Sequence, residues 1–131
     1  MTSRDGQRGH LLVVDAEHYL GRRLRQSLSH DHDIEMENRG DEVVRRLDGG
    51  AHFDVILCDV MMPDCTGPEL CAKLAVDHPI QAAGMVFMTD GVMSESARKS
   101  LATMSNLCIR RPFDADGMRA LVWRRTALGR A

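Results

Sequence analysis

Aromatic residues are scarce in this 131-residue chain, which has one Trp, one Tyr and three Phe. Proteins that bind nucleic acid commonly stack bases on aromatic side chains or carry a recognisable DNA-binding motif on a basic face. The chain has 4% aromatic residues, no such motif and a formal net charge of −2. We therefore expect no direct contact with nucleic acid.

Long apolar runs are also absent. A helix that spans a bilayer needs about 20 consecutive apolar residues, and no segment of the sequence approaches that length. The first nine residues lack the apolar segment that a secretory signal peptide carries. We expect a flexible lead-in over residues 1–9, one domain over residues 10–129, no membrane association and a cytoplasmic location.

Cysteine pairs of the Cys-x-x-Cys type do not occur among Cys58, Cys65, Cys71 and Cys108. Their spacing therefore matches neither a zinc site nor a dithiol motif. Two of them lie inside apolar segments, where free cysteine behaves as a small hydrophobic residue. This usage favours a reducing compartment. A regulatory role for Cys65, which lies in a loop, would require a lowered thiol pKa.

The charges are distributed unevenly along the chain. Residues 94–131 hold eight Lys or Arg against three Asp or Glu, whereas residues 1–93 hold nine against sixteen. The basic C-terminal part is either a solvated surface or a face that binds a partner, and composition favours neither interpretation.

Five short strand-like segments alternate with helical patterns. These segments are residues 11–14, 33–37, 55–59, 84–88 and 106–109. In the first helical pattern Leu20, Leu24 and Leu28 recur every four residues, which places them on one helix face. Strand–helix alternation with short loops predicts right-handed crossovers and a parallel sheet covered by helices on both faces. The predicted fold class is therefore α/β, with a doubly wound, five-stranded parallel sheet.

Two segments have more specific patterns. Residues 33–37 alternate polar and apolar side chains, as expected for an edge strand with one face in water. The last helix is predicted to begin at the N-cap residue Asp114, with Phe113 packed against Met118 in a hydrophobic staple. The apolar residues of that helix share one face: Met118, Leu121, Val122 and Leu128.

Asp59 is the most informative residue of the chain. It ends the segment Val-Ile-Leu-Cys-Asp, whose pattern predicts a strand buried on both faces. Burying an unpaired carboxylate is costly, so Asp59 must emerge at the carboxyl edge of the sheet, where open α/β sheets bind their ligands. Asp15, Thr89 and Arg111 follow or end the first, fourth and fifth strands and reach the same edge.

Two carboxylates, a hydroxyl and a cation at one edge suit phosphoryl chemistry. Carboxylate oxygens are ligands for Mg²⁺, and a carboxylate can itself act as the nucleophile that becomes an aspartyl phosphate. A hydroxyl donor and a fixed cation would stabilise the phosphoryl oxygens.

The chain resembles the receiver domain of two-component response regulators over nearly its whole length. The resemblance rests on the segments LLVVDAE (11–17), FDVILCDVMMPDCTG (53–67), VFMT (86–89) and RRPFD (110–114). The spacings agree as well, since Asp15 lies 44 residues before Asp59, and Thr89 and Arg111 lie 30 and 52 residues after it. The resemblance implies a flavodoxin-like (βα)5 receiver fold with strand order 2-1-3-4-5.

The resemblance also implies roles. Asp59 corresponds to the phosphoacceptor. The residues that correspond to the Mg²⁺ ligands are Asp15, Asp59 and, through its backbone carbonyl, Met61. The groups that contact the phosphoryl group correspond to Thr89 and Arg111. The implied partner is a histidine kinase or phosphotransfer protein. The implied output surface is the face of the fourth helix, fifth strand and fifth helix, which would bind an output partner or form a homodimer. A signalling phosphoprotein of this kind is not an enzyme.

Three positions depart from the family pattern. Ala16 replaces the second of two adjacent acids, and we expect this loss to weaken Mg²⁺ binding. Arg111 replaces a lysine, and a planar guanidinium differs in reach from an ammonium. Cys108 replaces the aromatic switch residue of the fifth strand. Glu17 is a possible substitute acid, and we hypothesise that Asp90 adds negative charge near the cleft.

Two other functions compete with a phosphorylated receiver. The first is a degenerate receiver that acts as a phosphorylation-independent interaction module. The second is a flavodoxin-like cofactor-binding enzyme, which the acidic loop Asp15-Ala16-Glu17 disfavours because it would repel a phosphate. The sequence identifies neither the cognate kinase nor the output, nor whether the receiver acts alone or within a larger protein.

Overall fold

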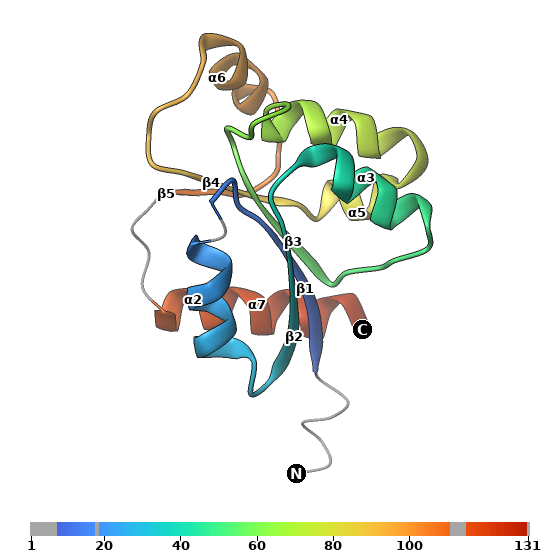
Figure 1. Ribbon diagram of the computed structural model, residues 1–131, viewed down its shortest axis with the longest axis vertical. Helices are drawn as coiled ribbons and strands as arrows, with labels where there is room; N and C mark the ends of the chain where they lie inside the picture. The colour runs from blue at the N-terminus through green and yellow to red at the C-terminus, as the bar shows by residue number, and fades with distance from the viewer. Residues whose placement is uncertain (1–7, 18, 111–114, 131) are drawn as a thin grey trace.

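The computed structural model describes residues 8–17, 19–110 and 115–130. Strands and helices alternate along this part of the chain (Figure 1). The strands are β1 (Gly9–Val14), β2 (His32–Glu37), β3 (Val55–Asp59), β4 (Val86–Thr89) and β5 (Cys108–Arg110). The helices are α2 (Tyr19–Leu28), α3 (Gly40–Asp48), α4 (Gly67–Asp77), α5 (Pro79–Ala83), α6 (Glu95–Ala102) and α7 (Ala115–Arg130).

The five strands form one parallel sheet in the order β2-β1-β3-β4-β5. The order and the parallel pairing confirm the predicted doubly wound, flavodoxin-like receiver fold. Because all strands run in one direction, their carboxyl ends lie along one edge of the sheet. This edge is where open α/β sheets form their binding sites.

Helices cover both faces of the sheet (Figure 1). Helices α2 and α7 pack on one face, where Leu24 and Leu28 of α2 and Met118 and Val122 of α7 are buried in one cluster. Helices α3, α4, α5 and α6 contribute to the cluster on the other face. None of the helices in the described part of the chain is long and apolar enough to cross a membrane.

Strand β3 lies at the centre of the sheet, and all five of its residues are buried. Its side chains alternate between the two clusters: Ile56 and Cys58 face one and Val55 and Leu57 face the other. Burying an aliphatic side chain of this size contributes roughly 1.5–3 kcal/mol. This explains why the segment is apolar throughout, and why its one charged residue, Asp59, comes last.

Some boundaries differ from the sequence-based expectation. Strand β4 ends at Thr89 rather than residue 88, and β5 comprises residues Cys108–Arg110 rather than 106–109. Helix α5 (Pro79–Ala83) was not predicted, because five residues are too few to show a helical repeat. The predicted N-cap at Asp114 and the contact of Phe113 with Met118 lie outside the described residues.

Strand β2 is the edge strand that its alternating pattern predicts. Its acids Glu35 and Glu37 lie on the face of the sheet that α3 covers, are partly exposed and have charged partners. The Arg46 side chain of α3 forms ion pairs with Glu35 and with Glu37, and His10 of β1 also pairs with Glu35. The edge strand is therefore shielded by charged side chains, which also discourage pairing with another strand.

Helix α3 is capped by a residue from a distant loop. Its own N-cap residue, Arg39, makes no side-chain capping hydrogen bond. Instead, the Asp64 carboxylate accepts hydrogen bonds from the backbone N–H groups of Gly40 at 2.9 Å and Asp41 at 3.0 Å. These are donors that a helix start leaves without intrahelical partners, so Asp64 ties α3 to the loop that follows β3.

Replacing Asp64 should therefore destabilise the fold. We expect Asp64→Ala to lower the free energy of unfolding by roughly 0.5–2 kcal/mol, the range measured for loss of a capping side chain. Urea denaturation followed by circular dichroism measures the change. Asp64→Asn keeps one acceptor oxygen and should lose less, so equal losses for the two variants would contradict the capping role.

The pH dependence of the free energy of unfolding provides a second check on the capping role of Asp64. Burial opposes the charged form of Asp64 most strongly, but the N–H donors of Gly40 and Asp41 and the nearby Arg39 together outweigh it and lower the pKa below its ordinary 3.8. A carboxyl with a lowered folded-state pKa stabilises the protein above its unfolded pKa and loses this effect as the pH falls through the folded value. The difference between wild type and Asp64→Ala should therefore shrink below about pH 4.

Candidate functional site

Two buried carboxylates lie at the carboxyl edge of the sheet. Asp59 is the last residue of β3 and is 8% exposed, and Asp15 directly follows β1 and is 3% exposed. Strands β1 and β3 are hydrogen-bonded neighbours, so the sheet itself brings the two acids to adjacent strand ends. The structure thus confirms that these two predicted residues meet at the same edge.

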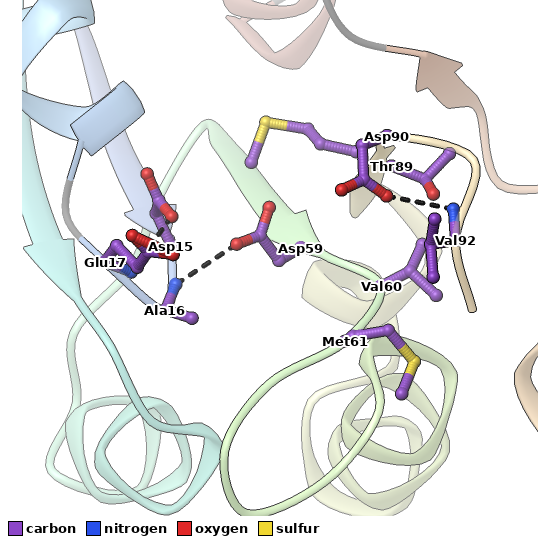
Figure 2. A pocket seen from close by; sticks show the side chains of 10 residues that line it. Asp15, Ala16, Glu17, Asp59, Val60, Met61, Thr89, Asp90 and Val92 are labelled. Carbon is purple, nitrogen blue, oxygen red and sulfur yellow. Dashed lines mark hydrogen bonds between the residues drawn. The ribbon is translucent and has the colours of Figure 1, made fainter. Parts of the chain in front are cut away.

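Backbone N–H groups of the loop after β1 orient both acids. The N–H of Ala16 donates to Oδ2 of Asp59 at 3.1 Å, and the N–H of Glu17 donates to Oδ1 of Asp15 at 3.2 Å. Figure 2 shows the bond from Ala16 reaching across to Asp59. These two hydrogen bonds hold the carboxylates in fixed orientations. Residue 16 therefore orients Asp59 through its backbone N–H, although its methyl side chain has no atom that could bind a metal ion.

A cavity of about 380 Å³ opens above these acids (Figure 2). Four acids line it, and no Lys, Arg or His does so in the described part of the chain. An excess of negative charge in a partly enclosed space attracts cations and opposes the approach of an anion. The lining residues are Asp15, Ala16, Glu17, Asp59, Val60, Met61, Met88, Thr89, Asp90 and Val92.

Thr89 ends β4 and begins a tight loop on the other side of the cavity. Its Oγ1 accepts a hydrogen bond from the N–H of Gly91 at 2.9 Å, and Asp90 Oδ1 accepts one from the N–H of Val92 at 2.9 Å. Gly91 has a φ of +100°, a backbone conformation that favours glycine. Asp90 is exposed yet lines the cavity, so its carboxylate adds negative charge at the mouth, in agreement with the hypothesis from the sequence.

The predicted cation, Arg111, lies outside the described residues. A different cation is found nearby: Arg110, the last residue of β5, which pairs with Thr89 in the sheet register. A Cβ atom added to Gly91 would lie 2.7 Å from a guanidinium nitrogen of Arg110, so this side chain rests directly on the loop after Thr89. Arg110 was not among the predicted site residues, and its place next to Arg111 was the one signal in the sequence that could have indicated it.

Met61 lies in the loop after β3 and is 41% exposed. It forms an isolated bridge with Thr66, and the N–H of Met62 donates to the carbonyl of Cys65 at 3.0 Å. Met61 lines the same cavity as Asp59, and its side chain points away from the Asp59 carboxylate (Figure 2). The loop is thus closed back on itself at the position predicted to present a backbone carbonyl.

Gly67 allows the first turn of α4 to approach the end of β3. Its N–H donates to the carbonyl of Val60 at 2.6 Å. A Cβ atom on residue 67 would lie 2.8 Å from the carbonyl oxygen of Asp59 and 3.0 Å from the ring of Phe87. A larger residue at this position would therefore push directly against the backbone of Asp59.

We expect Gly67→Ala to destabilise the domain by roughly 1–3 kcal/mol, as overpacked substitutions do, and to displace Asp59. Urea denaturation measures the first effect, and NMR chemical shifts of residues 58–61 report the second. Gly84→Ala is a matched control, because its added Cβ would meet its nearest atoms at 3.7 and 3.8 Å, ordinary contact distances. Equal effects of the two substitutions would show that close approach at Gly67 is not the cause.

The cysteines nearest the site are not activated thiols. Burial, above all, raises the pKa of Cys65 to about 11 and raises the pKa of Cys58 well above its ordinary value. A reactive thiol needs a lowered pKa, because the thiolate is the nucleophile. The condition that a regulatory role for Cys65 requires is therefore not met.

The carboxylates fit a hard cation only in part. Mg²⁺ prefers oxygen ligands and commonly keeps several waters beside one or two protein carboxylates, and Asp15 and Asp59 supply that type of donor. However, no three His, Cys, Asp or Glu side chains within residues 8–17, 19–110 and 115–130 converge as a metal-binding group. The methyl group of Ala16 leaves the set one acid short.

Comparisons with known proteins agree with this geometry. A protein-family model for the response regulator receiver domain matches residues 11–122. The chain is 36% identical over 70 residues to the transcriptional regulatory protein SpaR of Bacillus subtilis, a match that covers 53% of this chain and 30% of SpaR.

Solved structures show the same fold. A two-component response regulator from Clostridium difficile superposes with a TM-score of 0.77 at 17% identity, covering 95% of this chain and 100% of that one. The beryllofluoride-activated NtrC4 receiver domain, solved as a dimer in solution, gives a TM-score of 0.75 at 19% identity, covering 91% and 97% of the two chains.

Proposed function

The chain belongs to the response regulator receiver domain family, and we propose that it accepts a phosphoryl group on Asp59 from a histidine kinase or phosphotransfer protein. Receiver domains are signalling domains of two-component systems. The proposed domain covers residues 10–129, and its proposed location is the cytoplasm. The observation that carries this function is the buried Asp59 carboxylate, which ends the central strand and opens into the cavity.

The position of Asp59 suits a nucleophile. The rigid core on both faces of β3 fixes its backbone, and the N–H of Ala16 fixes its carboxylate. Positioning of this kind lowers the barrier because little reorganisation is needed when the donor arrives. Glu17, Asp90 and Asp15 line the same cavity but do not end the central strand, so Asp59 is the best placed of the four acids.

In the proposed transfer, one carboxylate oxygen of Asp59 attacks the phosphorus atom of the donor. A phosphorus–oxygen bond forms, the bond from phosphorus to the donor breaks, and its electron pair leaves with the donor. The product is an acyl phosphate on Asp59. The hydroxyl oxygen of Thr89 accepts a hydrogen bond from the N–H of Gly91. Its O–H group remains able to donate a hydrogen bond to a phosphoryl oxygen.

Receiver domains generally bind Mg²⁺ at their acidic pocket. Here Asp15, Asp59 and the backbone carbonyl of Met61 would hold the ion, with waters completing its coordination. When bound, Mg²⁺ supplies positive charge that offsets the acids and the incoming phosphoryl group. The missing acid at Ala16 makes this binding weak. We propose that two arginines contact the phosphoryl group: Arg111, and Arg110, which lies against the loop after Thr89.

We propose that the signal leaves through the face formed by α6, β5 and α7. Helices α6 and α7 are the predicted fourth and fifth helices, because α5 was not predicted. Thr89 is paired with Arg110 of β5, and Arg110 rests on Gly91, so a shift of Thr89 is transmitted to β5. Cys108 and Arg110 are exposed on this strand, where a partner can contact them. The occupant would be an output protein or a second copy of the chain; the NtrC4 receiver domain provides a dimeric precedent.

The direct test is incubation with acetyl phosphate and Mg²⁺, followed by mass spectrometry of the intact protein. The expected result is one added phosphoryl group, removed by hydroxylamine as expected for an acyl phosphate. Failure to form this adduct, together with failure to bind beryllofluoride, would contradict the proposal.

A degenerate receiver is the second candidate, and the observation that favours it is the side chain of Ala16 at the edge of the cavity. In that case partner binding would not depend on phosphorylation. If Ala16→Asp combined with Arg111→Lys forms the adduct that the wild type lacks, these two departures account for the missing phosphorylation, as a degenerate receiver requires.

A further inference from the structure

A second cavity lies at the opposite edge of the sheet, where the strands begin. It has a volume of about 580 Å³, within the range of ligand-binding pockets. Its walls come from the segments that precede β3, β4 and β5 and from α5 and α7, two helices on opposite faces of the sheet (Figure 1). The lining residues are His52, Phe53, Asp54, Ile56, Ile80, Gln81, Gly84, Leu107, Leu121, Arg124 and Arg125.

This second cavity, which we call the groove, combines an apolar floor with exposed aliphatic side chains. Phe53 and Ile56 are each 1% exposed and form part of the floor, whereas Ile80 is 83% exposed and Leu107 is 41% exposed. Single exposed apolar residues are common on protein surfaces, but apolar groups gathered around a concavity indicate a binding site.

Two guanidinium groups line the same groove without a carboxylate partner. In the described chain, Arg124 makes no hydrogen bond or ion pair, and Arg125 makes one long hydrogen bond, 3.4 Å, to the carbonyl of Gly84. One acid, Asp54, lines the groove, and its Oδ2 already accepts a hydrogen bond from the N–H of His10 at 2.8 Å. The groove therefore offers positive charge to a ligand.

The frame of the groove is held by hydrogen bonds. Gln81 and Phe53 are joined twice, since Gln81 Nε2 donates to the Phe53 carbonyl at 2.6 Å and the Phe53 N–H donates to Gln81 Oε1 at 2.8 Å. Asn106 Nδ2 donates to the carbonyls of Ala82 at 3.0 Å and Met85 at 2.9 Å. Because this frame is already ordered, a ligand would not have to organise it on binding.

We propose that this groove binds an acidic, amphipathic peptide segment of a partner protein. Aliphatic side chains of the segment would contact Ile80 and Leu107, and its carboxylates would pair with Arg124 and Arg125, whose planar forks suit bidentate pairing. A peptide fits better than a nucleic acid, because no Trp or Tyr lines the groove and the Phe53 ring is buried and not available for stacking on bases.

The proposed groove is separate from the Asp59 cavity. The two lie at opposite edges of the sheet and share no lining residue. A partner could therefore remain bound at the groove during phosphorylation, and the groove would tether the receiver to a protein without blocking the acceptor. Peptide binding at the groove does not require phosphoryl transfer to Asp59.

The test uses a fluorescein-labelled peptide with Glu-Glu-Leu repeats, titrated with the full chain and followed by fluorescence anisotropy. We expect saturable binding that weakens with added salt, as partly exposed ion pairs do. The double substitution R124E/R125E and the single substitution Ile80→Glu should each weaken binding at least tenfold. A peptide with Lys in place of Glu should not bind.

Matched control variants carry the same change of charge at positions outside the groove. R98E/R119E alters two exposed arginines outside the groove, and Val76→Glu alters a residue of α4 that is 79% exposed; both should bind the peptide like wild type. Asp59→Asn should also bind like wild type, which separates this site from phosphorylation. Absence of binding, or equal weakening by groove and control variants, would overturn the proposal. So would a dimer, detected by sedimentation, that R124E/R125E dissociates, because a second copy would then be the occupant.

Discussion

Replacing Asp59 by Asn is expected to abolish formation of the phosphoryl adduct. The amide has nearly the shape of the carboxylate but no anionic oxygen that could attack phosphorus. The other acids that line the cavity, Asp15, Glu17 and Asp90, do not end the central strand, so we expect none of them to replace Asp59 as the acceptor. Mass spectrometry of the intact protein after incubation with acetyl phosphate and Mg²⁺ should show one added phosphoryl group for the wild type and none for Asp59→Asn.

The matched control is Asp77→Asn, which removes a carboxylate from the exposed last residue of α4. It lowers the negative charge by the same amount and should leave the adduct unchanged. Circular dichroism should show that both variants are folded. An adduct of full yield on Asp59→Asn would mean that Asp15, Glu17 or Asp90 is the acceptor, and peptide mapping would identify which.

Ala16→Asp is expected to raise the affinity for Mg²⁺ at least about tenfold, which corresponds to about 1.4 kcal/mol. Residue 16 lines the cavity, and its N–H already donates to Asp59, so a carboxylate on its Cβ would add a third acid beside Asp15 and Asp59. An added anionic oxygen ligand strengthens the binding of a hard cation. Isothermal titration calorimetry with MgCl₂ measures the change.

Ala16→Asn is the control for this prediction, because it adds nearly the same volume and one neutral oxygen. It should raise the affinity much less. In the absence of metal, Ala16→Asp should have a lower melting temperature than Ala16→Asn, because like charges in a partly buried site repel. Saturating Mg²⁺ should reverse that order, since a ligand that binds only the folded state stabilises it. Equal affinities for the two variants would contradict a role for the added carboxylate as a ligand.

The sheet could be predicted because its signals are local. The segments of β1 and β3 are short and apolar, and the spacing of Leu24 and Leu28 indicates one buried face of α2. Helix α5 could not be predicted this way, because it is shorter than two helical turns. The ends of β4 and β5 also shifted by one or more residues, because strand length depends on pairing with neighbours.

Long-range contacts limited what could be predicted of the site. Asp15, Asp59 and Thr89 were found because each follows or ends a recognisable strand, and parallel strands bring such residues together. The capping of α3 by Asp64 joins residues 24 positions apart, and no periodicity reveals it. The contact of Arg110 with Gly91 likewise depends on the register of β4 with β5.

Local sequence is enough to predict the fold class, the acids at the carboxyl edge of the sheet and the absence of an acid at position 16. These follow from hydrophobic patterning, from the cost of burying a charge, and from residue identity. Long-range packing decided that the Ala16 N–H holds Asp59 and that Arg110 rests on the loop after Thr89. It also decided that Arg124 and Arg125 line a groove with Ile80 and Leu107. Hydrogen bonds and packing contacts act over a few ångströms in space, and only the folded chain brings residues that are distant in sequence to such distances.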